Sequence, residues 1–223
     1  MVTLVSLIRR ARAFVGGNGR QACSNNYFSS GRDSSLASFY ADEGLARRYY
    51  YLLDSRGQLF LESSKHRNFA TSIRDAKVLS LFFRMMRPIK KQEVSLLASI
   101  DTCNPSSSYR WVSVCGKETN FVATEDEIAS VGFTDLDGTS GDLLYAAGQL
   151  SEPFDPDMVH IASSTGRLYH PVNNHRFLKG TWGLLHPSLA QKLMKTASVQ
   201  ADTYSFEFQG KVKVLRELQL VES

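Results

Sequence analysis

Short runs of β-forming residues joined by tight turns recur along this chain from position 47 onward, and this feature constrains its fold most. Residues 47–53 and 58–61 are rich in aromatic and aliphatic side chains, and Asp54-Ser55-Arg56-Gly57 between them has the composition of a tight turn. We therefore predict a hairpin here. The same pattern predicts two further hairpins, at 109–115 with 120–122 around Gly116-Lys117, and at 204–209 with 212–215 around Gly210.

Two segments carry helical spacing instead. Asn68 is a residue type that caps helices, and Pro88 ends the periodic pattern that follows it. The apolar side chains expected on the buried face of this helix are Phe69, Ile73, Ala76, Leu79, Phe82, Phe83 and Met86. A further helix is predicted over 188–195. Adjacent hairpins with few helices predict an α+β fold, with a mostly antiparallel sheet built from successive hairpins and two or three helices.

The remaining segments fit one domain. Strands are predicted at 128–134 and 143–147, and the segment 158–162 fits either a helical turn or a strand. Residues 101–108 have the composition of a linker, and no repeat is visible in the sequence. Since the chain has 223 residues, about one domain is expected. We expect a single globular α+β domain at 41–223.

Residues 1–40 differ from the rest of the chain in charge. The chain has 26 basic and 22 acidic residues, of which five arginines and Asp33 lie in 1–40, so 41–223 holds 21 of each. The first forty residues are Arg-rich, Ser-rich and acid-poor, with apolar positions on one helical face, which is typical of a mitochondrial presequence. We predict a mitochondrial targeting segment and disordered linker at 1–40 and a location in the matrix. A basic tail without this role and a plastid address are the alternatives.

Composition also argues against several classes of partner and site. A neutral 41–223 argues against nucleic acid, because attraction to phosphates drives nonspecific binding. No run reaches the roughly 20 apolar residues of a membrane helix, so no membrane span is predicted. Cys23, Cys103 and Cys115 make neither a disulfide framework nor a zinc site, and the last two are expected to be reduced thiols.

One local motif has a catalytic counterpart. Residues 133–139, Phe-Thr-Asp-Leu-Asp-Gly-Thr, resemble the nucleophile motif of the haloacid dehalogenase superfamily of phosphatases. In that chemistry Asp135 would attack phosphorus and Asp137 would handle the leaving-group proton, beside magnesium at the end of a parallel strand. No alternation of strands and long helices follows to build the required sheet, and the run also fits a loop. A magnesium-dependent phosphatase is therefore the least favoured alternative.

The other candidate chemistry involves a thiol. Cys115 with Glu118 nearby and His170 elsewhere could form a thiol and base pair, although a buried structural cysteine is commoner. The histidines share no metal-ligand spacing with Cys or Asp, so no metal site is predicted. No motif indicates a cofactor, and the cofactor is unknown.

Several short segments, taken together in order and spacing, carry a resemblance. They are 49–51 with 57–61, 65–69, 82–84 with Arg87, 114–118 with 120–121, 153–154 and 166–171. Over nearly all of 47–220 the chain resembles an uncharacterised family of eukaryotic, mostly mitochondrial proteins, typified by a human chromosome-eight open-reading-frame product and grouped as a domain of unknown function. The resemblance implies mitochondrial residence and supplies no activity. The residues that match its motifs, and are the candidate binding site, are Cys115, Gly116, Glu118, Asn120, Arg167, Tyr169 and His170.

Three hypotheses of function follow. The first is an accessory or interaction protein of the mitochondrial matrix whose sheet binds a protein partner. The second is a small-molecule enzyme or ligand-binding domain with a polar site near Cys115 and His170. The third is the phosphatase that uses Asp135 and Asp137. The sequence leaves open whether the chain is an enzyme.

Overall fold

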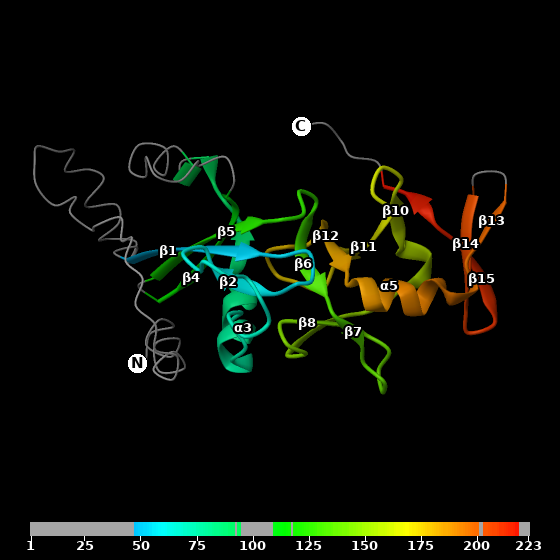
Figure 1. Ribbon diagram of the computed structural model, residues 1–223, viewed down its shortest axis with the longest axis horizontal. Helices are drawn as coiled ribbons and strands as arrows, with labels where there is room; N and C mark the ends of the chain where they lie inside the picture. Colours follow the sequence, from blue (N-terminus) through cyan, green and yellow to red (C-terminus); the bar gives the residue numbers. More distant parts are fainter. Residues whose placement is uncertain (1–46, 92, 95–108, 117, 201–202, 219–223) are drawn as a thin grey trace, which may run out of the picture.

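The computed structural model describes residues 47–91, 93–94, 109–116, 118–200 and 203–218. Four β-sheets dominate this part of the chain, and the two five-stranded sheets lie side by side along the long axis of the molecule (Figure 1). The targeting segment predicted at 1–40 and the linker predicted at 101–108 lie outside the described residues.

The N-terminal sheet has the strand order β2-β1-β5-β4-β3. Its strands are β1 (Arg47–Leu53), β2 (Leu59–Leu61), β3 (Met86–Pro88), β4 (Tyr109–Cys115) and β5 (Glu118–Thr124). The hairpins β1–β2 and β4–β5 are confirmed, but β1 also pairs in parallel with β5. Helix α3 (Ala76–Arg84) packs against one face of the sheet through Val78, Leu79, Phe82 and Phe83.

The central sheet has the order β16-β10-β11-β12-β6. Its strands are β6 (Ala129–Phe133), β10 (His160–Ala162), β11 (Arg167–Val172), β12 (Thr181–Leu185) and β16 (Arg216–Glu217). Strands β10, β11 and β12 are successive antiparallel neighbours, whereas β6 pairs in parallel with β12. The strand predicted at 128–134 is therefore present as β6. Of the two alternatives for 158–162, the strand is the one found, as β10, and the 3₁₀ turn η2 (Pro156–Met158) ends where this segment begins.

The two large sheets share one topology. In each, three consecutive antiparallel strands are preceded in sequence by a strand that pairs in parallel with the last of them, which gives the orders β1-β5-β4-β3 and β6-β12-β11-β10. The sequence shows no repeat, so this repetition is one of strand arrangement alone.

The smaller elements complete the molecule. The small sheet contains β7 (Asp135–Leu136), β8 (Leu143–Tyr145) and β9 (Leu150–Glu152), all antiparallel. Helix α5 (Pro187–Leu193) and the 3₁₀ turn η3 (Met194–Thr196) lead into the C-terminal sheet of β13 (Ser198–Gln200), β14 (Thr203–Phe208) and β15 (Lys211–Val214). The predicted last helix and last hairpin are thus confirmed. The C-terminal sheet stands at one end of the molecule, away from α3 (Figure 1).

A direct backbone contact joins the two large sheets. Gly57 in the β1–β2 turn has φ +77°, and a Cβ on Gly132 of β6 would lie only 2.4 Å from the Gly57 Cα. One apolar core runs across the joint and includes Tyr51 and Phe82 from the N-terminal side and Phe133 from the central sheet. The two sheets therefore pack as one body.

The predicted fold class is wrong. The described chain is mostly β, with two short α-helices of nine and seven residues, and both large sheets are mixed rather than antiparallel. Hairpin signals are local, whereas the parallel pairs β1–β5 and β6–β12 join strands far apart in sequence and leave no local pattern. The α+β description gave the predicted helices too much weight.

The first predicted helix also starts later than expected. Asn68 caps one isolated turn, since its Oδ1 accepts from the N–H groups of Ala70 and Thr71. Asp75 is the cap of α3, and Met86 lies in β3. Phe69, predicted in the core, is 62% exposed.

Candidate functional site

The β4–β5 hairpin brings three of the predicted site residues to one buried face. Cys115 pairs with Glu118 and Ser113 with Asn120, so all four side chains lie on the same side of the sheet. The face is covered by α3, because Ser113 Oγ donates to the carbonyl of Phe82 at 2.7 Å. Asn120 Nδ2 donates to the carbonyl of Ser113 at 2.9 Å.

The environment of Cys115 favours a protonated thiol. Burial raises the pKa of Cys115, and the negative charge of Glu118 raises it further, while the contact with Ser113 Oγ at 3.5 Å opposes this only in part. A thiolate nucleophile needs the opposite surroundings. This cluster therefore has the character of a structural polar layer beneath α3.

Arg167 and Tyr169 belong to a second cluster, on the central sheet. Both bind Asp126 Oδ2, through Arg167 Nη1 at 2.7 Å and the Tyr169 hydroxyl at 2.8 Å. Asp126 Oδ1 accepts from the N–H groups of Ile128 and Ala129. Burial alone would raise the pKa of Asp126, but these four hydrogen bonds together hold it below its usual range. Asp126 was not singled out from the sequence, because its two side-chain partners lie more than forty residues away.

His170 is engaged away from both clusters. Its Nδ1 donates to the carbonyl of Pro171 at 2.8 Å, and its Nε2 accepts from the N–H of Asp155 at 3.1 Å. The ring packs against Phe133 and Phe154, and burial lowers the pKa of His170, so the ring is neutral at pH 7. With both nitrogens used, His170 is not the base for Cys115.

Two further buried ionisable groups hold one loop. His175 Nε2 donates to the carbonyl of Phe83 at 2.8 Å, and burial lowers the pKa of His175. The carboxylate of Glu152, 1% exposed, accepts from the N–H groups of Asn173 and Asn174. Burial raises the pKa of Glu152 despite these bonds. No pattern in the sequence marks either residue, because each binds backbone atoms of a distant segment.

The two aspartates of the phosphatase motif are used locally. Asp135, exposed on β7, forms an ion pair with Lys192 Nζ at 3.0 Å. Asp137 accepts from the N–H of Thr139 and the hydroxyl of Ser140, which closes its own loop. The motif does follow a parallel strand, β6, but Asp135 itself lies in β7, which pairs antiparallel with β8. The geometry therefore indicates that this motif is a structural loop.

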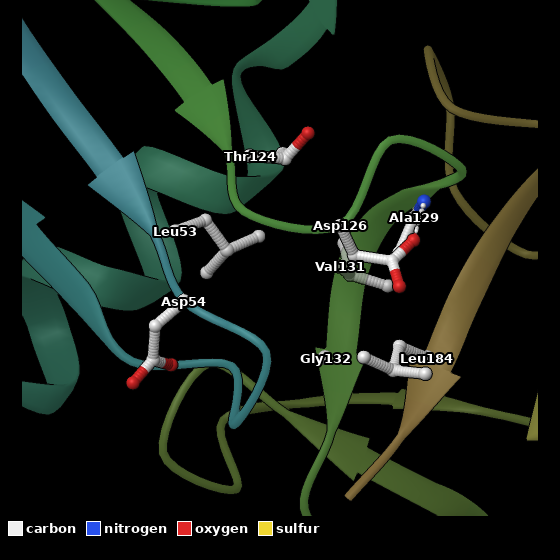
Figure 2. Close-up of a pocket in the computed structure, with 8 residues that line it drawn as sticks. All are labelled: Leu53, Asp54, Thr124, Asp126, Ala129, Val131, Gly132 and Leu184. Carbon is white, nitrogen blue, oxygen red and sulfur yellow. Dashed lines mark hydrogen bonds between the residues drawn. The ribbon is translucent and has the colours of Figure 1, made fainter. Parts of the chain in front are cut away.

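One pocket among the described residues is the size of a single water molecule. A hollow between the two large sheets, lined by Leu53, Asp54, Thr124, Asp126, Ala129, Val131, Gly132 and Leu184, holds about 10 Å³, or one water molecule (Figure 2). No group of three or more His, Cys, Asp or Glu side chains within the described ranges is placed to hold a metal ion. In the part of the chain that the structure describes, every helix is too short or too polar to span a bilayer.

Residues 41–219 match the family described as "Domain of unknown function (DUF4505)". The chain belongs to this family. Two solved structures are similar to the DUF4505 chain at low sequence identity. A DUF1285 family protein from Silicibacter pomeroyi DSS-3 is 13% identical, with 77% of this chain and 82% of that chain covered and a TM-score of 0.44. A DUF1285 family protein from Shewanella baltica OS155 is 15% identical, with 63% and 86% covered and a TM-score of 0.39.

The large apolar side chains that the DUF4505 domain exposes fall in two places. Within the described ranges, Phe69, Leu81 and Met85 lie on α3 and the turn before it, and the other four lie in the C-terminal sheet: Val199, Tyr204, Val212 and Val214. Clustered exposed apolar side chains are typical of interaction surfaces, whereas single ones are ordinary. These two surfaces are therefore functional candidates of the domain.

Proposed function

We propose that the protein is a non-enzymatic accessory protein of the mitochondrial matrix that binds an extended segment of a partner protein along β15. The observation that carries this proposal is the open edge of the C-terminal sheet, where Val212 is 74% exposed and Val214 52% exposed. Strand β15 is the last in the order β13-β14-β15, so one of its edges has no strand beside it among the described residues.

The backbone of β15 is oriented for strand addition. The N–H of Leu215 donates to the carbonyl of Tyr204 at 2.8 Å, and antiparallel residues alternate between bonding a neighbour and pointing away from it. By this alternation the backbone groups of Lys211 and Lys213 face β14, and those of Val212 and Val214 point to the open edge. An added strand would form main-chain hydrogen bonds with these two residues.

The body of the protein holds β15 in place. Lys213 Nζ forms an ion pair with Asp157 Oδ2 at 2.6 Å, which fixes one face of the strand to η2. Phe206 of β14 is 1% exposed, and Phe208 packs against Phe154 with ring centroids 5.3 Å apart. A preformed edge loses little conformational entropy on binding.

The side chains of β15 define the partner. Val212 and Val214 share one face, and the exposed Lys211 lies on the other. The matching segment alternates apolar residues with acidic ones. Edge lysines disfavour pairing between two copies of this chain, because like charges would meet across the new pair. The partner is therefore a different protein.

The test compares the full chain with Val212→Pro, both tagged and produced in cells, in matrix released from purified mitochondria. Proline removes an N–H that points to solvent and leaves the β14–β15 ladder intact. We expect the wild type to comigrate with a partner on a native gel, and Val212→Pro to migrate as the free chain with a similar melting temperature. In the isolated complex, hydrogen exchange should slow at the amides of Val212 and Val214.

The control is Val212→Thr, which keeps the N–H and the side-chain shape and should retain most binding. A wild type that migrates as the free chain, or a complex that survives Val212→Pro, would contradict the proposal. Absence of the protein from the matrix fraction would contradict its proposed location.

A further inference from the structure

The exposed face of α3 carries two large apolar side chains among cations. At about 100° of rotation per residue, Lys77, Leu81, Arg84 and Met85 fall within one stripe, and the four buried residues of the helix face the core. Leu81 is 48% exposed and Met85 38% exposed. Surface helices normally keep this face polar, whereas Met, Arg and aromatic residues are enriched at protein interfaces.

The turn before α3 carries a further exposed aromatic ring, Phe69, close in sequence to the start of the helix. Asn68 Oδ1 accepts from the N–H groups of Ala70 and Thr71 at 3.0 and 3.2 Å, and Ser72 Oγ donates to the carbonyl of Phe69 at 2.9 Å. The guanidinium of Arg74 lies over the Phe69 ring, 4.1 Å from its centroid. The ring is 62% exposed yet held by its neighbours, so binding through it orders few new torsions.

The cations of this surface have no acidic partner in the described part of the chain. Arg74, Lys77 and Arg84 are absent from every ion pair formed there. Between Phe69 and Met85 the only acid is Asp75, whose carboxylate caps α3. The whole of 41–223 is neutral, so this is a local positive surface, and it is complementary to an anionic partner.

We propose that this surface, formed by Phe69, Arg74, Lys77, Leu81, Arg84 and Met85, binds an amphipathic helix of a partner protein in which acidic residues flank an apolar face. We call it the α3 surface. It does not depend on the β15 edge, which lies toward the other end of the molecule (Figure 1).

Other anionic partners fit the α3 surface less well. Phe69 is the one ring of this surface, and its face is already taken by Arg74. Leu81 and Met85 offer nucleic acid neither a ring to stack on nor a hydrogen-bond donor. The Phe69 ring cannot enter the hydrocarbon layer of a membrane without bringing the Arg74 charge with it. A second copy of the chain would present the same cations and meet them with repulsion.

Fluorescence anisotropy with the purified full chain tests this proposal. The probe is a labelled synthetic peptide of about 18 residues, five helical turns, with leucines on one face and glutamates beside them. A peptide with the same leucines and lysines in place of the glutamates is its control. We expect the acidic peptide alone to bind, and Leu81→Ser and Lys77→Glu each to weaken binding by about tenfold.

Val199→Ser, at an exposed apolar residue of β13 outside the β15 edge, is the matched control variant and should bind the acidic peptide as the wild type does. Equal binding of both peptides, or unchanged affinity in Leu81→Ser and Lys77→Glu, would overturn the proposal. Tighter binding of oligouridylate, or of vesicles of phosphatidylcholine and phosphatidylserine, that Lys77→Glu abolishes would assign the α3 surface to that partner instead. Self-association that Lys77→Glu removes, measured by sedimentation, would also overturn it.

Discussion

At the scale of single residues, the hydrogen bonds of Asp126 are expected to contribute to the stability of the fold. Its buried carboxylate accepts four hydrogen bonds, two of them from Arg167 and Tyr169. Asp126→Asn loses the charge that both partners bind and should lower the free energy of unfolding at pH 7 by about 2 kcal/mol, measured by urea denaturation. Glu127→Gln changes an exposed carboxylate one residue away and should have little effect. An unchanged urea midpoint in Asp126→Asn would show that the cluster contributes nothing to stability.

The lowered pKa of Asp126 also predicts how the stability of the protein changes with pH. The folded pKa of Asp126 is lowered below the unfolded value of about 3.9, so its stabilisation is present above about pH 4 and is lost as the pH falls through the folded pKa. Urea midpoints measured from pH 7 down to pH 3 should therefore fall less steeply in Asp126→Asn than in the wild type. Parallel profiles would contradict the lowered pKa.

The candidate site residues show what a sequence can reveal at this scale. Cys115, Glu118 and Asn120 belong to one hairpin, where the alternation of side chains places them on the same face, so their proximity is predictable. Arg167 and Tyr169 also alternate, but their partner Asp126 comes from another segment. Only the tertiary fold brings that carboxylate to them.

At the scale of elements, the cap of α3 is Asp75 in the structure, whereas the sequence predicts Asn68. Asp75 Oδ1 accepts from the N–H groups of Lys77 and Val78 at 2.9 and 3.0 Å, which satisfies two donors that the helix leaves unpaired. Asp75→Ala should lower the free energy of unfolding by about 1 kcal/mol, measured by thermal or urea unfolding. Asn68→Ala, at the residue predicted as the cap, should cost clearly less because it loosens only an exposed turn. If Asn68→Ala lowered the free energy of unfolding more than Asp75→Ala does, the helix cap would be Asn68 instead.

Elements with local signals are the predictable part of this fold. Asp54 and Gly57 shape the β1–β2 turn within a few residues, and Gly210 does the same for β14–β15, where its φ is +74°. Asn68 misled the prediction because it caps a turn as well as it would cap a helix. The parallel pairings of β1 with β5 and β6 with β12 depend on packing across the whole chain and have no counterpart in local sequence.

At the scale of the whole molecule, the two proposed surfaces lie in different halves. One half is the N-terminal sheet with α3, and the other is the central sheet with the C-terminal sheet. The α3 surface belongs to the N-terminal sheet and the β15 edge to the C-terminal sheet (Figure 1). Two partners could therefore be bound at once without touching each other. Such a protein would set the distance between its partners only if its two halves behave as one rigid unit, and the Gly57–Gly132 contact is where this can be tested.

Gly132→Ala tests the joint between the halves. The added Cβ would lie 2.4 Å from the Gly57 Cα, a backbone atom that cannot move aside as a side chain can. We expect the free energy of unfolding to fall by about 2 kcal/mol, as overpacked cores do. Gly138→Ala is the matched control, because its Cβ would meet nothing within 4 Å.

The two tryptophans of the chain report the halves separately, since Trp111 lies in β4 and Trp182 in β12. With one tryptophan at a time replaced by Phe, fluorescence should give the same unfolding midpoint for both halves, because one core spans the joint. In a Gly132→Ala background, both midpoints should shift together. If only the Trp182 midpoint moves, or if the midpoints differ already without the Gly132 change, the halves unfold independently. The chain would then link its two partners flexibly rather than hold them at a fixed distance.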